Sequence, residues 1–152
     1  MLKHDLMEGL QAAIEDLPNV TVRDVSFEAP LSKRSRPDAM MSVDFDGRKI
    51  DLVIEVLQTA YPRDVREKIW QITQYREDID ISASEPIAML IANTISKGAR
   101  ALLKEASIGY YDASGSLFLP AKSMYVLVDR PAKAKARKVR DAIFKGQRKE
   151  GI

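Results

Sequence analysis

Asp38 and Glu55 are the residues of this 152-residue chain best suited to chemistry, because the sequence around them predicts a β-hairpin that brings them together. The turn is expected at Asp46-Gly47, since a tight turn between two strands needs positive φ, which glycine adopts without a steric clash. Two carboxylates that converge on one point can hold a divalent cation. The hairpin is therefore the first place to look for a functional site.

The second strand of this hairpin places Glu55 in apolar surroundings. Side chains alternate between the two faces of a strand. The core face is predicted to consist of Ile50, Leu52, Ile54 and Val56. Glu55 lies on the opposite face, between Val53 and Leu57. A buried carboxylate is tolerated only when it is paired or holds a metal, so Glu55 is expected to have a cationic partner.

A helix over about residues 62–79 is predicted to follow the hairpin. Pro62 suits its first turn, and apolar residues at helical spacing run from Val65 to Ile79. Trp70 is assigned to the core. One face of this helix carries, at spacings of four, three and four, Asp64, Lys68, Gln71 and Tyr75.

The remaining elements predict an α/β fold. Leu2, Leu6 and Leu10 begin a helical apolar pattern that predicts a helix over 2–17. Ser96 is a candidate N-cap for a helix that ends near Ala106. Strands are expected over 19–27, 86–93, 108–111, 116–119 and 123–128. The order is an α-β-β-β-α-β core with an α-β-β extension, and a central mixed β-sheet flanked by helices is the expected architecture.

Composition and charge set broad limits. The chain has no cysteine, which excludes disulfides and thiolate metal sites and favours a reducing compartment, the cytoplasm. No apolar run approaches the length of a membrane span. Net charge is +2 at pH 7, but eight of the 24 Lys and Arg residues lie in the basic segment 131–152, which has only two acidic residues, Asp141 and Glu150.

Pro37-Asp38 on one strand and Glu55 on the next resemble the motif of the PD-(D/E)xK nuclease superfamily, which has the restriction-endonuclease-like fold. Gln71-x-x-x-Tyr75 is similar to the helix motif of its RecB-like branch. The resemblance covers about residues 2–128. It implies phosphodiester cleavage with Mg²⁺ or Mn²⁺, held by Asp38, Glu55 and the carbonyl of Val56. It also implies a carboxylate on the first helix, either Glu8 or Glu15, with Glu15 nearer the sheet in sequence.

The chain departs from the family pattern at Leu57, where the family has a lysine that positions the attacking water and stabilises charge on the phosphate. Gln58 is predicted to point to the other strand face and is a poor substitute. Lys68, one helical turn before Gln71, is a candidate for a displaced catalytic lysine, although pairing with Asp64 would explain it equally well. Lys33 is a second, less favoured donor.

The basic segment 131–152 is predicted to be helical, and it resembles the linker and first helix that lead into a winged-helix domain in some proteins with this nuclease-like domain. On this view residues 1–130 form the nuclease-like domain. Basic side chains favour phosphate backbones by releasing counterions. The expected nucleic-acid contacts come from the loop before Asp38 and from the tail: Lys33, Arg34, Arg36, Lys133, Lys135, Arg137, Lys138 and Arg140.

The sequence thus predicts a nuclease-fold domain that binds nucleic acid, with DNA as the expected partner and with cleavage impaired or lost because of Leu57. The alternative is an active Mg²⁺-dependent deoxyribonuclease that uses Asp38 and Glu55 with Lys68. No membrane association is expected, and a homodimer or larger assembly is left open.

Overall fold

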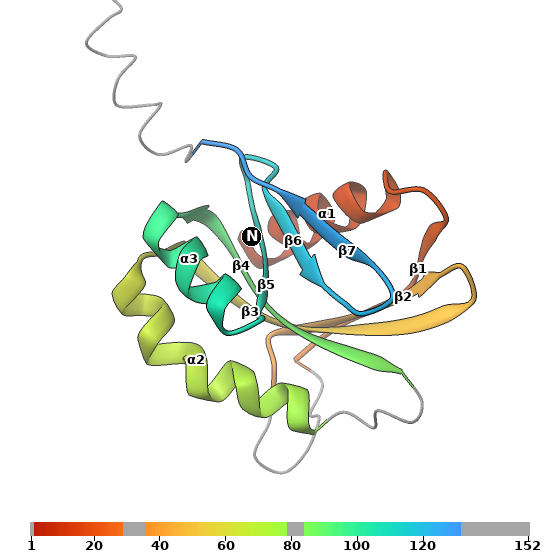
Figure 1. The fold of residues 1–152 in the computed structure, drawn as a ribbon, viewed down its shortest axis with the longest axis horizontal. Helices are drawn as coiled ribbons and strands as arrows, with labels where there is room; N and C mark the ends of the chain where they lie inside the picture. Colours follow the sequence, from red (N-terminus) through yellow and green to blue (C-terminus); the bar gives the residue numbers. More distant parts are fainter. Residues whose placement is uncertain (1, 29–35, 79–83, 132–152) are drawn as a thin grey trace, which may run out of the picture.

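The computed structural model describes residues 2–28, 36–78 and 84–131 of the chain. They form three helices and seven strands (Figure 1). In chain order these are α1 (Leu2–Glu15), β1 (Val20–Phe27), β2 (Ala39–Phe45), β3 (Arg48–Ala60), α2 (Pro62–Glu77), β4 (Glu85–Ile95), α3 (Lys97–Glu105), β5 (Gly109–Asp112), β6 (Leu117–Pro120) and β7 (Tyr125–Val128).

The strands form one mixed sheet in which spatial order follows sequence order, from β1 to β7. The pairs β3–β4 and β4–β5 are parallel because a helix connects each pair, and the other pairs are antiparallel. This confirms the predicted α/β class with a mixed sheet flanked by helices. All three strands expected after α3 form, as β5, β6 and β7, so the part after β4 has one strand more than the α-β-β notation of the extension.

The hairpin β2–β3 forms around the predicted turn. Asp46 and Gly47 both have positive φ, 52° and 89°, and the Gly47 N–H donates to Asp44 Oδ1 at 2.8 Å. The register pairs Ala39 with Ile54, so its continuation by one residue places Asp38 opposite Glu55. The turn therefore sets the alignment of the two carboxylate-bearing residues.

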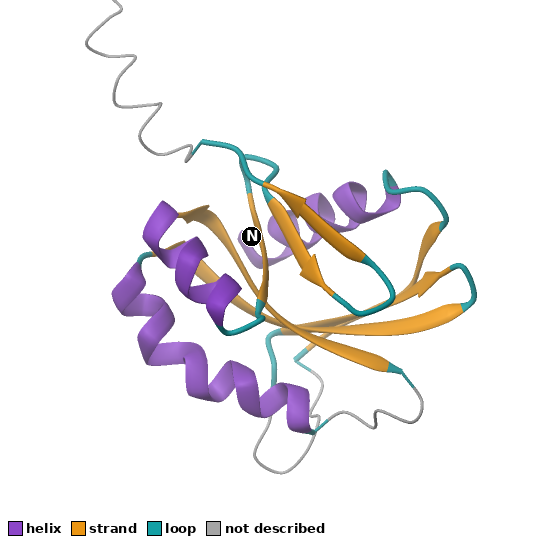
Figure 2. Cartoon of the chain, in the orientation of Figure 1, coloured by secondary structure: helices purple, strands orange, loops and turns teal. Residues whose placement is uncertain are grey.

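Both faces of the sheet are covered, α1 lying on one face and α2 with α3 on the other (Figure 2). Ile50, Leu52 and Ile54 of β3 pack with α1 in one apolar core, as predicted for the core face. Val65 and Ile72 of α2 pack with β4 and α3 in a second core on the opposite face. Glu55 therefore projects from β3 into a face that α2 covers.

Helix α2 begins at Pro62 as predicted but does not place Trp70 in the core. Trp70 is 73% exposed, so the prediction of a core tryptophan is wrong. The helical repeat explains the error: Val65 and Ile72 point toward the sheet, and a residue two positions before Ile72 is rotated by about 200° from it. Trp70 accordingly faces solvent.

None of the helices in the described part of the chain combines the length and apolar character that a bilayer crossing needs.

Candidate active site

Glu55 is the centre of a small polar cluster between β3 and α2. It is only 6% exposed, and each of its carboxylate oxygens accepts a hydrogen bond. Tyr75 donates its hydroxyl to Oε1 at 2.8 Å, and Lys68 donates from Nζ to Oε2 at 3.2 Å. The buried carboxylate thus has the cationic partner that its apolar surroundings require.

Helix α2 supplies this cluster through residues one helical turn apart. The Asp64 carboxylate accepts the Tyr61 N–H at 2.9 Å and caps the start of the helix. Lys68 and Tyr75 lie further along the helix, on the side that adjoins Glu55. Gln71, between them, donates from Nε2 to the Tyr75 hydroxyl at 2.9 Å. The predicted face therefore divides into a cap residue and three residues gathered at Glu55.

Tyr75 stays protonated at its place in the cluster. Burial raises the pKa of its phenol well above the ordinary value of 10.0, and the hydrogen bond to the negatively charged Glu55 raises it further. The charge of Asp38 acts on the Tyr75 pKa in the same direction. The hydroxyl is consequently a permanent donor that holds the Glu55 carboxylate in one orientation.

Asp38 lies at the other side of this cluster and is more open to solvent, with a side chain that is 30% exposed. Its Oδ2 accepts the N–H of Val56 at 2.8 Å, which fixes the carboxylate against the residue next to Glu55. Within a strand, the N–H and C=O of one residue point toward the same neighbour, so the Val56 carbonyl also faces the Asp38 side. The predicted oxygen ligands thus lie around the end of β2.

Lys3 is a site residue that the sequence patterns did not indicate. Its Nζ lies 3.7 Å from Asp38 Oδ1 and donates to Glu28 Oε2 at 2.6 Å. The hydrogen bond to Glu28 raises the Lys3 pKa, so the ammonium group remains charged. Lys3 lies in the first turn of an amphipathic helix, and the spacing of residues along that helix does not indicate a contact with Asp38, which is distant in sequence.

Glu15 is not brought to this site. It lies twelve residues after Lys3 on α1, about 18 Å further along the helix axis. Its carboxylate accepts a hydrogen bond from Gln11 Nε2 at 3.4 Å and is exposed. The side chain of α1 that contacts Asp38 is the cation Lys3, in place of the expected carboxylate.

Leu57, where the sequence resemblance predicts a lysine, packs against the apolar core beneath α2 and α3. Gln58 is exposed. The ammonium group that the structure places on Glu55 belongs to Lys68, and Asp64, the alternative partner, is used as the cap of α2.

The predicted nucleic-acid contacts fall largely outside the described residues. Arg36 is exposed and donates to the backbone carbonyl of Glu28 at 3.1 Å. The other predicted contacts lie in segments 29–35 and 132–152, outside the described residues: Lys33, Arg34, Lys133, Lys135, Arg137, Lys138 and Arg140.

The donor set at this site suits a hard cation such as Mg²⁺. No group of three or more His, Cys, Asp or Glu residues within the described part of the chain is placed to hold a metal. Two carboxylates, Asp38 and Glu55, with one backbone carbonyl are nevertheless oxygen ligands of the kind that Mg²⁺ takes, since it usually keeps several waters and binds through one or two carboxylates plus substrate phosphates. The residues present therefore fit the ion that the family resemblance implies.

Comparisons with known proteins found similar backbone structures but no matching sequences. No protein-family model matches the sequence, and no curated protein matches it. A repair endonuclease from Pyrococcus abyssi is similar in structure, with a TM-score of 0.46 and 18% identity over 72% of this chain and 46% of that one. This chain thus spans about half the length of that endonuclease.

Two further solved structures are similar. An XisH family protein from Nostoc punctiforme PCC 73102 has a TM-score of 0.48 and 10% identity over 80% of this chain and 98% of its own. SfsA from Pyrococcus furiosus, solved in complex with Ca²⁺, has a TM-score of 0.35 and 12% identity over 84% of this chain and 63% of its own. At these TM-scores, no role for a residue or ligand follows from the likeness.

Proposed function

We propose that this chain is a Mg²⁺-dependent phosphodiester hydrolase of the PD-(D/E)xK type, acting on DNA, in which Lys68 replaces the motif lysine. The observation that carries the proposal is the 3.2 Å contact between Lys68 Nζ and Glu55 Oε2. In the family motif the lysine follows the acidic residue by two positions on the same strand. Here a lysine from α2 reaches that acidic residue instead, so the ammonium group would come from another element and would not be lost.

Asp38, Glu55 and the Val56 carbonyl would hold the cation. When bound, Mg²⁺ activates a water and neutralises charge on the scissile phosphate. The fixed orientation of both carboxylates supports this role, because preformed ligands need no rearrangement when the ion arrives. Val56 holds Asp38 through its N–H at 2.8 Å, and Tyr75 holds Glu55 at 2.8 Å.

Lys68 would supply positive charge to the transition state. Its side chain is 35% exposed, so the ammonium group contacts Glu55 while remaining open to solvent and to a substrate phosphate. Positive groups placed where negative charge develops stabilise the transition state of phosphoryl transfer. Lys3, beside Asp38, can neutralise an adjacent phosphate in the same way.

Tyr75 and Gln71 would act as positioning residues. Gln71 donates to the Tyr75 hydroxyl, which in turn donates to Glu55. This chain of donors ends at the Glu55 carboxylate and would hold it in one orientation for a cation. The four-residue spacing of Gln71 and Tyr75 corresponds to about one helical turn, which places both side chains on the side of α2 that lies over Glu55.

DNA is proposed as the substrate because of where the positive charge lies. Segment 131–152 carries eight of the Lys and Arg residues against two acidic residues. Such a segment binds the phosphate backbone with an affinity that falls steeply with salt. It would hold a polynucleotide near the domain whose acidic site cuts it.

The test is cleavage of supercoiled plasmid and of single-stranded DNA by the purified chain with Mg²⁺ or Mn²⁺. The wild type should cut, and Asp38→Asn should lose activity by about 10²-fold or more, as removal of a positioned catalytic group commonly does. Asp24→Asn is the matched control, since Asp24 is an exposed acid of β1 away from the cluster, and it should cut normally. A wild type that binds DNA but never cuts would reduce the chain to a binding module.

A metal titration separates ion binding from catalysis. Mg²⁺ should raise the melting temperature of the wild type, because a ligand that binds only the folded state stabilises it. Asp38→Asn should abolish that gain, whereas Asp24→Asn should keep it. A melting temperature that does not respond to millimolar Mg²⁺ or Mn²⁺ would contradict the proposed cation site.

A further inference from the structure

A cavity of about 790 Å³, separate from the polar cluster at Glu55, lies between α3 and the segment that follows β7. This size falls within the range of small-molecule sites. Residues from α3 form one wall and residues 129–131 form the other, and Tyr61, which follows β3, and Thr94, near the end of β4, lie at one end. None of Asp38, Glu55, Lys68 or Tyr75 lines the cavity, so ligand binding in it is independent of the proposed function.

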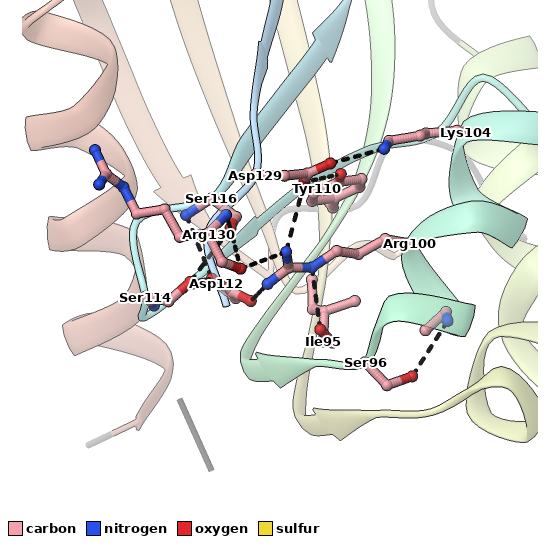
Figure 3. A network of polar contacts seen from close by, with 11 residues as sticks. Ile95, Ser96, Arg100, Lys104, Tyr110, Asp112, Ser114, Ser116, Asp129 and Arg130 are labelled. Carbon is pink, nitrogen blue, oxygen red and sulfur yellow. Dashed lines mark hydrogen bonds and ion pairs between the residues drawn. The ribbon is translucent and has the colours of Figure 1, made fainter. Parts of the chain in front are cut away.

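One side of this cavity is a rigid polar network around Arg100 (Figure 3). The Arg100 guanidinium donates to Asp112 Oδ2 and to the Arg130 carbonyl, both at 2.6 Å, and its Nε donates to the Ile95 carbonyl at 3.1 Å. The Arg130 side chain points away from α3 (Figure 3). The network therefore fixes the two walls relative to each other, and the cavity is a built feature of the fold.

The wall of the cavity includes a residue whose buried hydroxyl has no partner. Thr94 lines the cavity, is only 3% exposed, and its Oγ1 is the one buried side-chain polar atom among the described residues that has no hydrogen-bond partner. A buried hydroxyl left unpaired costs free energy, so such groups are rare in folded proteins and need an explanation. A ligand oxygen in the cavity would supply the missing bond.

The end of the cavity near Thr94 has an excess of hydrogen-bond donors. Lys97 is exposed, lines the cavity, and has no ion-pair or hydrogen-bond partner for its amine within the described residues. Ser96 caps the Ala99 N–H at 3.2 Å, which leaves the first N–H groups of α3 and the positive end of the helix dipole at this end. Hydrogen-bond acceptors with negative charge are therefore the chemical complement.

The opposite end of the cavity has no excess of positive charge, since the carboxylate of Glu105 also lines it. Asp129 accepts from Lys104 at 2.7 Å, lies 3.6 Å from Arg100, and accepts the hydroxyl of Tyr110. The unbalanced positive charge is thus confined to the end that contains Thr94 and Lys97. Tyr61 lies at this same end, because the Ser96 N–H donates to the carbonyl of its neighbour Ala60 at 3.0 Å.

We propose that this cavity binds a terminal phosphate monoester, with the phosphate beside Thr94 and Lys97 and an aromatic base against Tyr61. The phosphate oxygens accept from the Thr94 hydroxyl, the Lys97 amine and the start of α3, as helix N-termini commonly hold phosphates. The Tyr61 ring is half-exposed and offers a flat surface for stacking. A free mononucleotide and the 5′-phosphate end of a DNA strand share this chemistry.

Isothermal titration calorimetry on the full chain in EDTA tests the site without metal binding or cleavage at the first site. The probes are adenosine 5′-monophosphate, adenosine, and a single-stranded oligonucleotide with and without a 5′-phosphate. Adenosine 5′-monophosphate should bind and adenosine should not. A preference for the phosphorylated oligonucleotide would identify a strand end as the source, and equal binding of the two oligonucleotides would identify the mononucleotide.

Variants assign the binding to this cavity. Lys97→Gln should weaken the binding of adenosine 5′-monophosphate about tenfold, the size expected for a lost hydrogen bond to a charged group. Thr94→Val should weaken binding without lowering the melting temperature of the free protein, because valine fills the same volume without an unpaired hydroxyl. Lys122→Gln, at an exposed lysine in the β6–β7 turn, is the matched control and should change nothing. Equal binding of adenosine and its monophosphate, or equal effects of the two lysine variants, would overturn the proposal.

Discussion

Two polar clusters, one at Glu55 and one at Arg100, use the same chemistry but differ in how they meet solvent. In the Arg100 cluster, the paired side chains of Arg100 and Asp112 are 8% and 0% exposed and lie 2.6 Å apart. In the Glu55 cluster, the carboxylate is also buried, but its partner Lys68 is 35% exposed and lies 3.2 Å away. One ion pair is closed on both sides, and the other is open on the side of its cation.

The Asp112 carboxylate accepts more hydrogen bonds than the Glu55 carboxylate does. Asp112 accepts from Arg100, from the Ser114 N–H and hydroxyl, and from the Ser116 N–H, all within its own fold. Glu55 accepts only from Lys68 and Tyr75 among the described residues, which leaves lone pairs available. A saturated cluster holds elements together, whereas an unsaturated one that is open to solvent on the side of its cation can bind a ligand.

The largest expected effect breaks the closed cluster. Asp112→Ala should lower the free energy of unfolding by about 3–5 kcal/mol, because buried Arg100 would lose its nearest carboxylate and keep only the more distant Asp129, at 3.6 Å. Denaturant unfolding measures it, and Asp24→Ala, at an exposed acid, should cost almost nothing. A loss for Asp112→Ala below about 1 kcal/mol would show that the Arg100 cluster is not the structural one.

An intermediate effect comes from the tyrosine of each cluster. Tyr75 and Tyr110 both donate to a carboxylate, and burial with that hydrogen bond raises both pKa values above the ordinary 10.0. A tyrosine whose pKa is higher in the folded than in the unfolded protein stabilises the folded state, and this contribution is complete below the unfolded pKa of about 10. As the pH rises above that value, the free energy of unfolding falls by at most about 1.4 kcal/mol per tyrosine for each pH unit. Unfolding measured between about pH 9 and pH 11.5 should show this fall, and Tyr75→Phe and Tyr110→Phe should each flatten it. Unchanged slopes in both variants would contradict the buried, protonated state.

A smaller loss of stability than that of Asp112→Ala is expected for the open cluster. Lys68→Met should lower the free energy of unfolding by about 1–2 kcal/mol, because buried Glu55 loses its cation but keeps the hydrogen bond from Tyr75, and the Lys68 side of the pair is open to solvent. The same variant should lower DNA cleavage by about 10²-fold or more. A stability loss as large as that of Asp112→Ala would make Lys68 a structural residue and remove the contrast between the clusters.

The sequence could predict the features that depend on neighbouring residues alone, such as a tight turn or the spacing of side chains along one helix. Asp46 and Gly47 adopt the positive φ that Asp-Gly favours in tight hairpin turns, so the hairpin and the alignment of Asp38 with Glu55 could be predicted from the turn. The spacing of Lys68, Gln71 and Tyr75 follows from the helical repeat, which explains why all three gather at Glu55. Alternation and helical periodicity were sufficient for these elements.

Tertiary context decided what the sequence could not predict. Trp70 was expected in the core because tryptophan is large and apolar, but the helical phase set by Val65 and Ile72 turns it to solvent. Lys3 meets Asp38 only because α1 packs across the sheet. The Arg100 network joins α3, β5 and the residues after β7, a combination that no pattern within one element contains.

The ammonium group of Lys68 is proposed to do the work of the lysine that Leu57 replaces. Leu57 lies two residues after Glu55, on the same face of β3. A lysine placed there should therefore restore a cation to Glu55 when Lys68 is lost. Leu57→Gln combined with Lys68→Ala provides a matched polar control without charge.

The decisive measurement is the single-turnover rate of DNA cleavage with Mg²⁺ for the wild type, Lys68→Ala, and the double variant Leu57→Lys/Lys68→Ala. Lys68→Ala should cut about 10²-fold or more slowly than the wild type. The double variant Leu57→Lys/Lys68→Ala should cut at least about tenfold faster than Lys68→Ala, whereas Leu57→Gln/Lys68→Ala should cut no faster than Lys68→Ala. A Lys68→Ala variant that cuts as fast as the wild type would contradict a catalytic role for Lys68.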